Sequence, residues 1–157
     1  LLMPLRDGTV VRVWEQWIPQ PAETLWPFFC DVHNLEAITP PFLNFRVLGQ
    51  SDGEIGAGTR IDYRLRLDGI PIGWQSRIAS WDPPRAFVDT QVKGPYKLWH
   101  HTHEFVPMGE GTLMRDTVRY RLHAGWLGML TAGRRVASYV ERIFDYRARR
   151  IDEMFGR

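Results

Sequence analysis

The chain of 157 residues, 44 % hydrophobic and 24 % charged, has the length and composition of one soluble globular domain. Its net charge is only +2, and basic residues are interspersed with acidic ones, so no nucleic-acid-binding surface is expected. Every run without charged residues is shorter than the roughly 20 apolar residues that span a bilayer. We therefore predict a single domain, residues 1–157, without a membrane span.

Cysteine usage and the N-terminal sequence bear on the cellular compartment. Cys30 is the single cysteine, which excludes an internal disulfide and is typical of a reducing environment. The first residues, LLMPLRDG, have neither the charged start nor the long apolar stretch of a secretory signal. These features predict a cytoplasmic protein.

The N-terminal third predicts one strand followed by two short helices. A run rich in β-branched and aromatic residues predicts a strand over residues 9–18. Short helices are expected over residues 19–31 and 31–41, the second ended by two consecutive prolines. A period of two then begins and predicts a strand over residues 42–49.

The middle of the chain alternates between apolar and polar residues. The clearest example is TRIDYRLRL, whose apolar residues would all face one side of a sheet. Near residues 126–155 the apolar residues take helical spacing, which predicts one long amphipathic helix. This order indicates an α+β fold with a sheet wrapped around the helix. Glycine- and proline-containing turns delimit strands over residues 59–67, 72–81, 85–92, 97–107 and 112–122.

The segment GPYKLWHHTHEF holds three of the chain's five histidines. On a strand, His101 and His103 point to the same face. Short turns fix strand register, and closing each hairpin at its turn places Asp89 beside His101 and Asp116 opposite His103.

The same turns gather further polar and aromatic residues on this concave face. They predict Tyr63 opposite Ser76, and Ser76 beside Asp89. They also predict Gln91 beside Trp99, and Trp99 opposite Tyr120. Because each buried polar group without a partner costs about 1–3 kcal/mol, so many together indicate a cavity that holds water and a ligand with a polar part. The candidate binding residues are Tyr63, Trp74, Ser76, Asp89, Gln91, Trp99, His101, His103, Asp116 and Tyr120.

Several segments together resemble the SRPBCC superfamily, and most closely its bacterial polyketide-cyclase-like and ligand-binding branch. The resemblance implies a helix-grip fold, in which a seven-stranded antiparallel sheet wraps around the C-terminal helix and leaves an elongated cavity. It implies no metal and no cofactor, and the superfamily includes carriers, cyclases and chaperone-activating domains. The segments are WPFFCDVHNLEAITPP, WDPPRAF, GPYKLWHHTHEF, RDTVRYRL and, in the terminal helix, IFDYR.

Three interpretations of the histidines remain open. A metal site would use His101 and His103 with Asp89 or Asp116 as the third ligand, although we expect no metal. A catalytic pair of His103 and Asp116 would serve as acid and base in a cyclase or dehydratase. We favour the third, in which these residues line a binding pocket. Three positions are open to Arg147 on the apolar stripe of the helix: it pairs with an inward carboxylate, reaches the mouth of the cavity, or, as the default, extends its guanidinium to solvent.

The sequence therefore favours a carrier or sensor that binds a small or medium hydrophobic molecule with a polar group. The alternatives are a polyketide cyclase or dehydratase and a protein-interaction module of the chaperone-activating kind. The glycine-rich segments SDGEIGAG and HAGWLGMLTAG are candidates to gate entry to the pocket.

Overall fold

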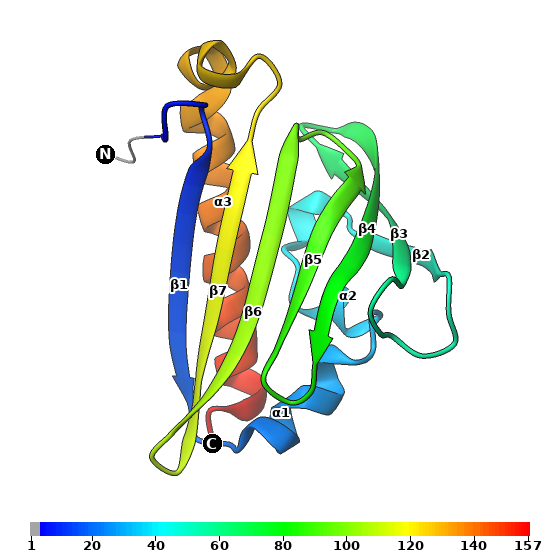
Figure 1. Ribbon diagram of the computed structural model, residues 1–157, viewed down its shortest axis with the longest axis vertical. Helices are drawn as coiled ribbons and strands as arrows, with labels where there is room; N and C mark the ends of the chain where they lie inside the picture. Colours follow the sequence, from blue (N-terminus) through cyan, green and yellow to red (C-terminus); the bar gives the residue numbers. More distant parts are fainter. Residues whose placement is uncertain (1–3) are drawn as a thin grey trace.

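A curved antiparallel sheet and one long helix make up most of the structure, a computed structural model that describes residues 4–157 (Figure 1). Residues 1–3, part of the predicted domain and of the N-terminal segment discussed above, lie outside the described part. The strands are β1 (Val10–Ile18), β2 (Arg46–Gln50), β3 (Arg60–Leu67), β4 (Ile70–Asp82), β5 (Ala86–Lys93), β6 (Leu98–Met108) and β7 (Gly111–Arg121). They lie in the order β1-β7-β6-β5-β4-β3-β2 across the sheet.

The helices lie on the concave face of this sheet. The long helix α3 (Gly125–Phe155) runs along β1 and β7, whereas α1 (Ala22–Phe29) and α2 (Asn34–Ala37) lie over the neighbouring part of the face (Figure 1). The structure thus confirms the predicted α+β helix-grip fold with two short helices after the first strand. Among the helices described between residues 4 and 157, not one pairs sufficient length with sufficient hydropathy for a membrane crossing.

The strand predicted from residue 42 begins later than expected. Pro41–Leu43 form a short 3-10 helix, and Asn44 follows with a positive φ of 44°. Proline fits the first position of a helix because its φ is fixed and its missing N–H would be unpaired there anyway. Because of these two features the extended backbone begins only after Asn44, and β2 starts at Arg46.

The register between β3 and β4 differs from the prediction by two residues. Leu67 pairs with Ile70 across a two-residue turn of Asp68 and Gly69, whose φ values are 51° and 77°. An Asp-Gly pair suits such a turn because both positions require positive φ. Tyr63 therefore lies opposite Trp74 rather than Ser76. A shift of two keeps every side chain on its predicted face.

The hairpin of β4 and β5 closes with Asp82 paired to Ala86, which changes its register from the predicted one, and two irregularities follow. They lie between Gln75 and Ser76 and between Ile78 and Ser80. The bulge between Ile78 and Ser80 adds one residue to β4 and shifts the later pairs by only one position, so the difference from the prediction arises at the turn. Ser76 consequently pairs with Gln91, not with Asp89, which pairs instead with Ile78.

The two hairpins around β6 have the predicted register. Asp89 pairs with His101 in one hairpin, and His103 pairs with Asp116 in the other. The pair of Trp99 and Tyr120 is also confirmed. The pairing of β5 with β6 ends at Thr90 and His100, so the predicted pair of Gln91 and Trp99 is not formed.

Candidate functional site

Five polar side chains from four elements meet in the interior of the sheet. His101 and His103 are only 5 % and 4 % exposed, and Arg147 and Asp116 are 7 % and 9 % exposed. Asp89 is half-buried beside them. We call these residues the polar cluster: Asp89 of β5, His101 and His103 of β6, Asp116 of β7 and Arg147 of α3.

The strand geometry brings the two imidazoles together. Alternate residues of β6 face the same side, so the rings of His101 and His103 lie with their centroids 3.6 Å apart. Phe87 stacks on the His103 ring at 3.9 Å, and Phe144 of α3 contacts His101 edge-on at 5.2 Å. Aromatic rings on both outer sides therefore restrict the orientation of the imidazoles.

Hydrogen bonds join the cluster into one network. His101 Nε2 lies 2.9 Å from Asp116 Oδ1, and His103 Nε2 lies 2.7 Å from Asp89 Oδ2. Arg147 Nη2 is 3.2 Å from His103 Nδ1. Because a guanidinium only donates, His103 Nδ1 is the acceptor of that bond, which leaves the proton on Nε2 for donation to Asp89.

Arg147 pairs with an inward carboxylate, one of the three positions open to it, and the default position in solvent is wrong. Its side chain points inward and its Nη2 also lies 3.6 Å from Asp116 Oδ1. A buried carboxylate without a cation would be costly, so the attraction to Asp116 outweighs the solvation that Arg147 would gain outside. The sequence carried a signal for this pair, since each residue is the lone charge on an otherwise apolar face.

Burial and charge set the protonation of the cluster. Burial alone would raise the pKa of Asp116, but the charge of the Arg147 guanidinium and the hydrogen bond from His101 hold it well below its ordinary value. Burial would likewise raise the pKa of Asp89, but the hydrogen bond from His103 and nearby positive charge keep it lowered.

Burial lowers the pKa of His101 to about 4, an effect that His103 reinforces and the hydrogen bond to Asp116 only partly opposes. The His101 imidazole is therefore neutral at neutral pH. Two carboxylates, those of Asp89 and Asp116, then face the single guanidinium of Arg147.

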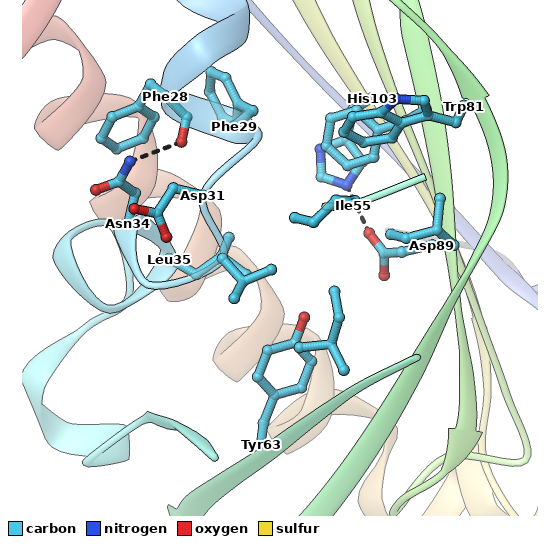
Figure 2. Close-up of a pocket in the computed structure, with 14 residues that line it drawn as sticks. Phe28, Phe29, Asp31, Asn34, Leu35, Ile55, Tyr63, Trp81, Asp89 and His103 are labelled. Atoms are coloured by element: carbon cyan, nitrogen blue, oxygen red, sulfur yellow. Dashed lines mark hydrogen bonds and ion pairs between the residues drawn. The ribbon is translucent and has the colours of Figure 1, made fainter. Parts of the chain in front are cut away.

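Asp89 and His103 also form part of the wall of a hollow next to the cluster. The hollow lies between the α1–α2 region and strands β3 to β5, and Figure 2 shows the Tyr63 hydroxyl pointing into it. The other lining residues are mostly apolar, among them Phe28, Leu35 and Trp81. Its volume, counted as space open to the centre of a water molecule, is about 40 Å³. A few waters fit this space, whereas drug-sized ligands need about 300–1,000 Å³.

A second opening reaches the cluster from the other side. A groove of about 210 Å³ lies between β1 and α3, and both Asp116 and Arg147 line it. The polar cluster is thus a partition between the groove and the hollow.

Seven of the ten candidate binding residues do not line the hollow. Tyr63, Asp89 and His103 line it, and His101 and Asp116 lie directly behind them. The remaining five lie on the neighbouring part of the concave face: Trp74, Ser76, Gln91, Trp99 and Tyr120.

These five residues are largely occupied with one another and with nearby backbone. Trp74 Nε1 donates to Ser76 Oγ at 3.0 Å. Gln91 makes two hydrogen bonds to the backbone of Tyr96, at 2.8 and 3.0 Å, and so holds the turn before β6. The rings of Trp99 and Tyr120 pack around Tyr96.

Helices α1 and α2 provide a wall of the hollow that was not predicted from the sequence. Phe28, Phe29 and Leu35 line the hollow from these helices, and Ile55 lines it from the glycine-rich loop before β3. Adjacent aromatic residues in α1 were a signal for a buried surface. Strand register, however, says nothing of where a helix is placed.

Comparison with known proteins identifies the family. Residues 18–142 match the model of the family described as polyketide cyclase / dehydrase and lipid transport. The chain belongs to this family. It is therefore a hydrophobic-ligand-binding or cyclase-like member of the SRPBCC superfamily. No curated protein shows significant sequence similarity to the chain.

Solved structures support the same fold for this family member. The Zhui aromatase/cyclase from Streptomyces sp. R1128 has a TM-score of 0.70 at 18 % identity, over 91 % of each chain. Protein Ms6760 from Mycobacterium smegmatis has a TM-score of 0.66 at 19 % identity, over 98 % of this chain and 94 % of that one. Major latex-like protein 151 from Panax ginseng has a TM-score of 0.64 at 15 % identity, over 94 % of this chain and 98 % of that one. Similarity at these identities establishes the helix-grip fold.

Proposed function

We propose that the protein binds a small, neutral, hydrophobic molecule in the hollow and holds its polar group against Asp89 and His103. The observation that carries this proposal is a hydrogen-bonded carboxylate–imidazole pair in the wall of a mostly apolar hollow. A ligand hydroxyl can donate to a carboxylate oxygen of Asp89, which the hydrogen bond from His103 holds in place. Membership of a family named for cyclases and lipid transport supports such a ligand.

The charge of the site selects against anions. The polar cluster has two carboxylates and one guanidinium, so a ligand carboxylate would bring a further negative charge into a buried site. Neutral alcohols, phenols and ketones bring no such cost. This narrows the expected ligand to molecules without an ionised acid.

The hollow must enlarge for a ligand of more than a few atoms. Its movable wall consists of the short helix α2, the turn before it and the loop that carries Ile55. That loop is the first of the two predicted gates, SDGEIGAG. The other, HAGWLGMLTAG, contributes no residue to the lining of the hollow.

Calorimetry with 2-naphthol and 2-naphthoate tests the proposal, because the two probes share a ring system and differ in charge. With the protein kept free of metal, we expect saturable binding of 2-naphthol and at least tenfold weaker binding of 2-naphthoate. Asp89→Asn should weaken 2-naphthol binding at least fivefold. The matched control is Asp31→Asn, which changes the other carboxylate at the hollow and should alter affinity less than twofold. Unsaturable binding or a preference for the anion would contradict the proposal.

A cyclase or dehydratase is the second candidate, favoured by the contacts of His103. The predicted acid–base partner was Asp116, but the shortest carboxylate contact of His103 is with Asp89, at 2.7 Å. A carboxylate in that position orients the ring and stabilises the imidazolium that forms when it takes a proton. If the protein is such an enzyme, His103→Ala should abolish turnover of a polyketide-like ketone while retaining its binding. Unchanged turnover would exclude this role.

A further inference from the structure

We propose that Asp89, His101 and His103 form a binding site for one divalent transition-metal ion. Each offers one ligand atom, and these atoms all lie within 4.8 Å of one another. Asp89 Oδ2 is 2.7 Å from His103 Nε2 and 3.6 Å from His101 Nδ1. Ligand atoms bound at about 2.1 Å in tetrahedral or octahedral geometry lie roughly 3.0–3.4 Å apart. The observed separations bracket that range, so small adjustments complete the site.

The far sides of the two rings supply an independent observation. The nitrogens that do not face Asp89 both face the same oxygen of Asp116: His101 Nε2 at 2.9 Å and His103 Nδ1 at 3.2 Å. Metal-bound histidines almost always donate their other N–H to a carboxylate or carbonyl, which fixes the ring and raises its basicity. Asp116 is placed to accept from both ligands at once.

A bound cation explains why one Asp116 oxygen faces a nitrogen of both histidines better than hydrogen bonds alone do. In the metal-free network, His103 uses its one proton toward Asp89, and its Nδ1 accepts from Arg147. A metal ion on Nε2 moves that proton to Nδ1, where it can be donated to Asp116. The guanidinium of Arg147 then turns fully to Asp116, which it already approaches to 3.6 Å.

Charge and ligand type indicate the class of ion. The cluster buries two carboxylates against one guanidinium, and a divalent cation would offset this excess of carboxylates. Two imidazoles and one carboxylate suit zinc, cobalt, nickel or iron, whereas calcium and magnesium prefer all-oxygen sites. Since Asp89 and His103 also line the hollow, the remaining coordination positions would open toward it. The inference does not depend on the proposed function, because a metal ion can bind without an organic ligand.

Titration of chelator-treated protein with Co²⁺ and with Zn²⁺ tests this site. We expect one ion per chain by calorimetry, with visible d–d absorption for Co²⁺. Asp89→Asn and His101→Ala should each lower the affinity at least 100-fold, and Asp116→Asn about 10–100-fold. The matched control is His100→Ala, on the opposite face of the same strand, which should leave the affinity unchanged.

If a variant of the polar cluster fails to fold, the titration of the wild-type protein still decides the test. A wild-type chain that binds neither ion at 1:1 stoichiometry overturns the proposal, as does a His100→Ala variant that loses as much affinity as His101→Ala. Failure here leaves 2-naphthol binding by the metal-free protein unaffected, so the two proposals can fail separately.

Discussion

The two sides of the polar cluster differ in how well their interiors are filled. The side of β1, β7 and α3 borders the groove of about 210 Å³, but its interior is closely packed: Val118 and Tyr120 are completely buried, Val140 is 1 % exposed, and Trp14 stacks on Phe144 at 4.2 Å. We call this the filled side. On the side of β3 to β5, the hollow of about 40 Å³ remains between the sheet and the short helices. We call this the hollow side.

The difference follows from the helices that cover each side. The 31 residues of α3 present one continuous stripe, in which Val140, Phe144 and Ile151 are buried at helical spacing. Helices α1 and α2 have only eight and four residues, and a turn separates them. Short elements joined by loops cannot fill a concave face evenly. The filled side therefore provides stability, and the hollow side provides space that can change.

Removal of a large side chain from the filled side should have the largest effect on stability. Phe144 is 3 % exposed and contacts both Trp14 and His101. Phe144→Ala should lower the free energy of unfolding by about 3–5 kcal/mol, measured by urea denaturation. Phe42→Ala is the control, because Phe42 is 41 % exposed and should cost much less. A loss below about 1 kcal/mol for Phe144→Ala would mean that this side is not tightly packed.

Removing one partner of the Arg147–Asp116 ion pair in the polar cluster should have the next largest effect on stability. Arg147→Met leaves Asp116 as a buried carboxylate without its guanidinium and should lower the free energy of unfolding by about 3 kcal/mol. Adding Asp116→Asn removes the unpaired charge and should recover part of that loss. If the two substitutions are additive in a double-mutant cycle, Arg147 and Asp116 do not act as a pair.

Replacing one buried valine by leucine on each side compares directly how tightly the filled side and the hollow side are packed. Val118 is completely buried on the filled side, and Val32 is 4 % exposed and lines the hollow. Val118→Leu should cost about 1–2 kcal/mol because the extra methylene has no space. Val32→Leu should change the free energy of unfolding by less than about 0.5 kcal/mol, because its extra methylene enters the hollow. Equal costs in denaturation experiments would show that the hollow cannot accept a side chain.

The four strand residues of the polar cluster were predictable because their positions follow from strand alternation and short turns. His101 and His103 share a face by period alone, and the two hairpins around β6 have the expected register. The shift between β3 and β4 was also encoded in the sequence, since Asp68-Gly69 favours a two-residue turn. The closing pair of the β4–β5 turn, Asp82 with Ala86, and the bulges that follow it carry no such signal, because bulges depend on how the whole sheet bends and not on local turn residues.

The location of the hollow could not be predicted from the strands. It depends on how far α1 and α2 fill the concave face, and that depends on packing between segments distant in sequence. Arg147 illustrates the same limit. Its place on the apolar stripe was clear, but its inward direction depends on Asp116, which another element supplies. Periodicity assigns a residue to a face and does not name its partner.

The smallest expected effect concerns Tyr120, a candidate binding residue that lies on the filled side. Its hydroxyl is buried and has no hydrogen-bond partner among residues 4–157. Removing an unpaired buried hydroxyl removes its desolvation cost, so Tyr120→Phe should raise the free energy of unfolding by up to about 1 kcal/mol. Tyr120 does not line the hollow, so 2-naphthol affinity should change less than twofold. A clear loss of affinity in Tyr120→Phe would place the ligand against the filled side, and the division between the two sides would then be wrong.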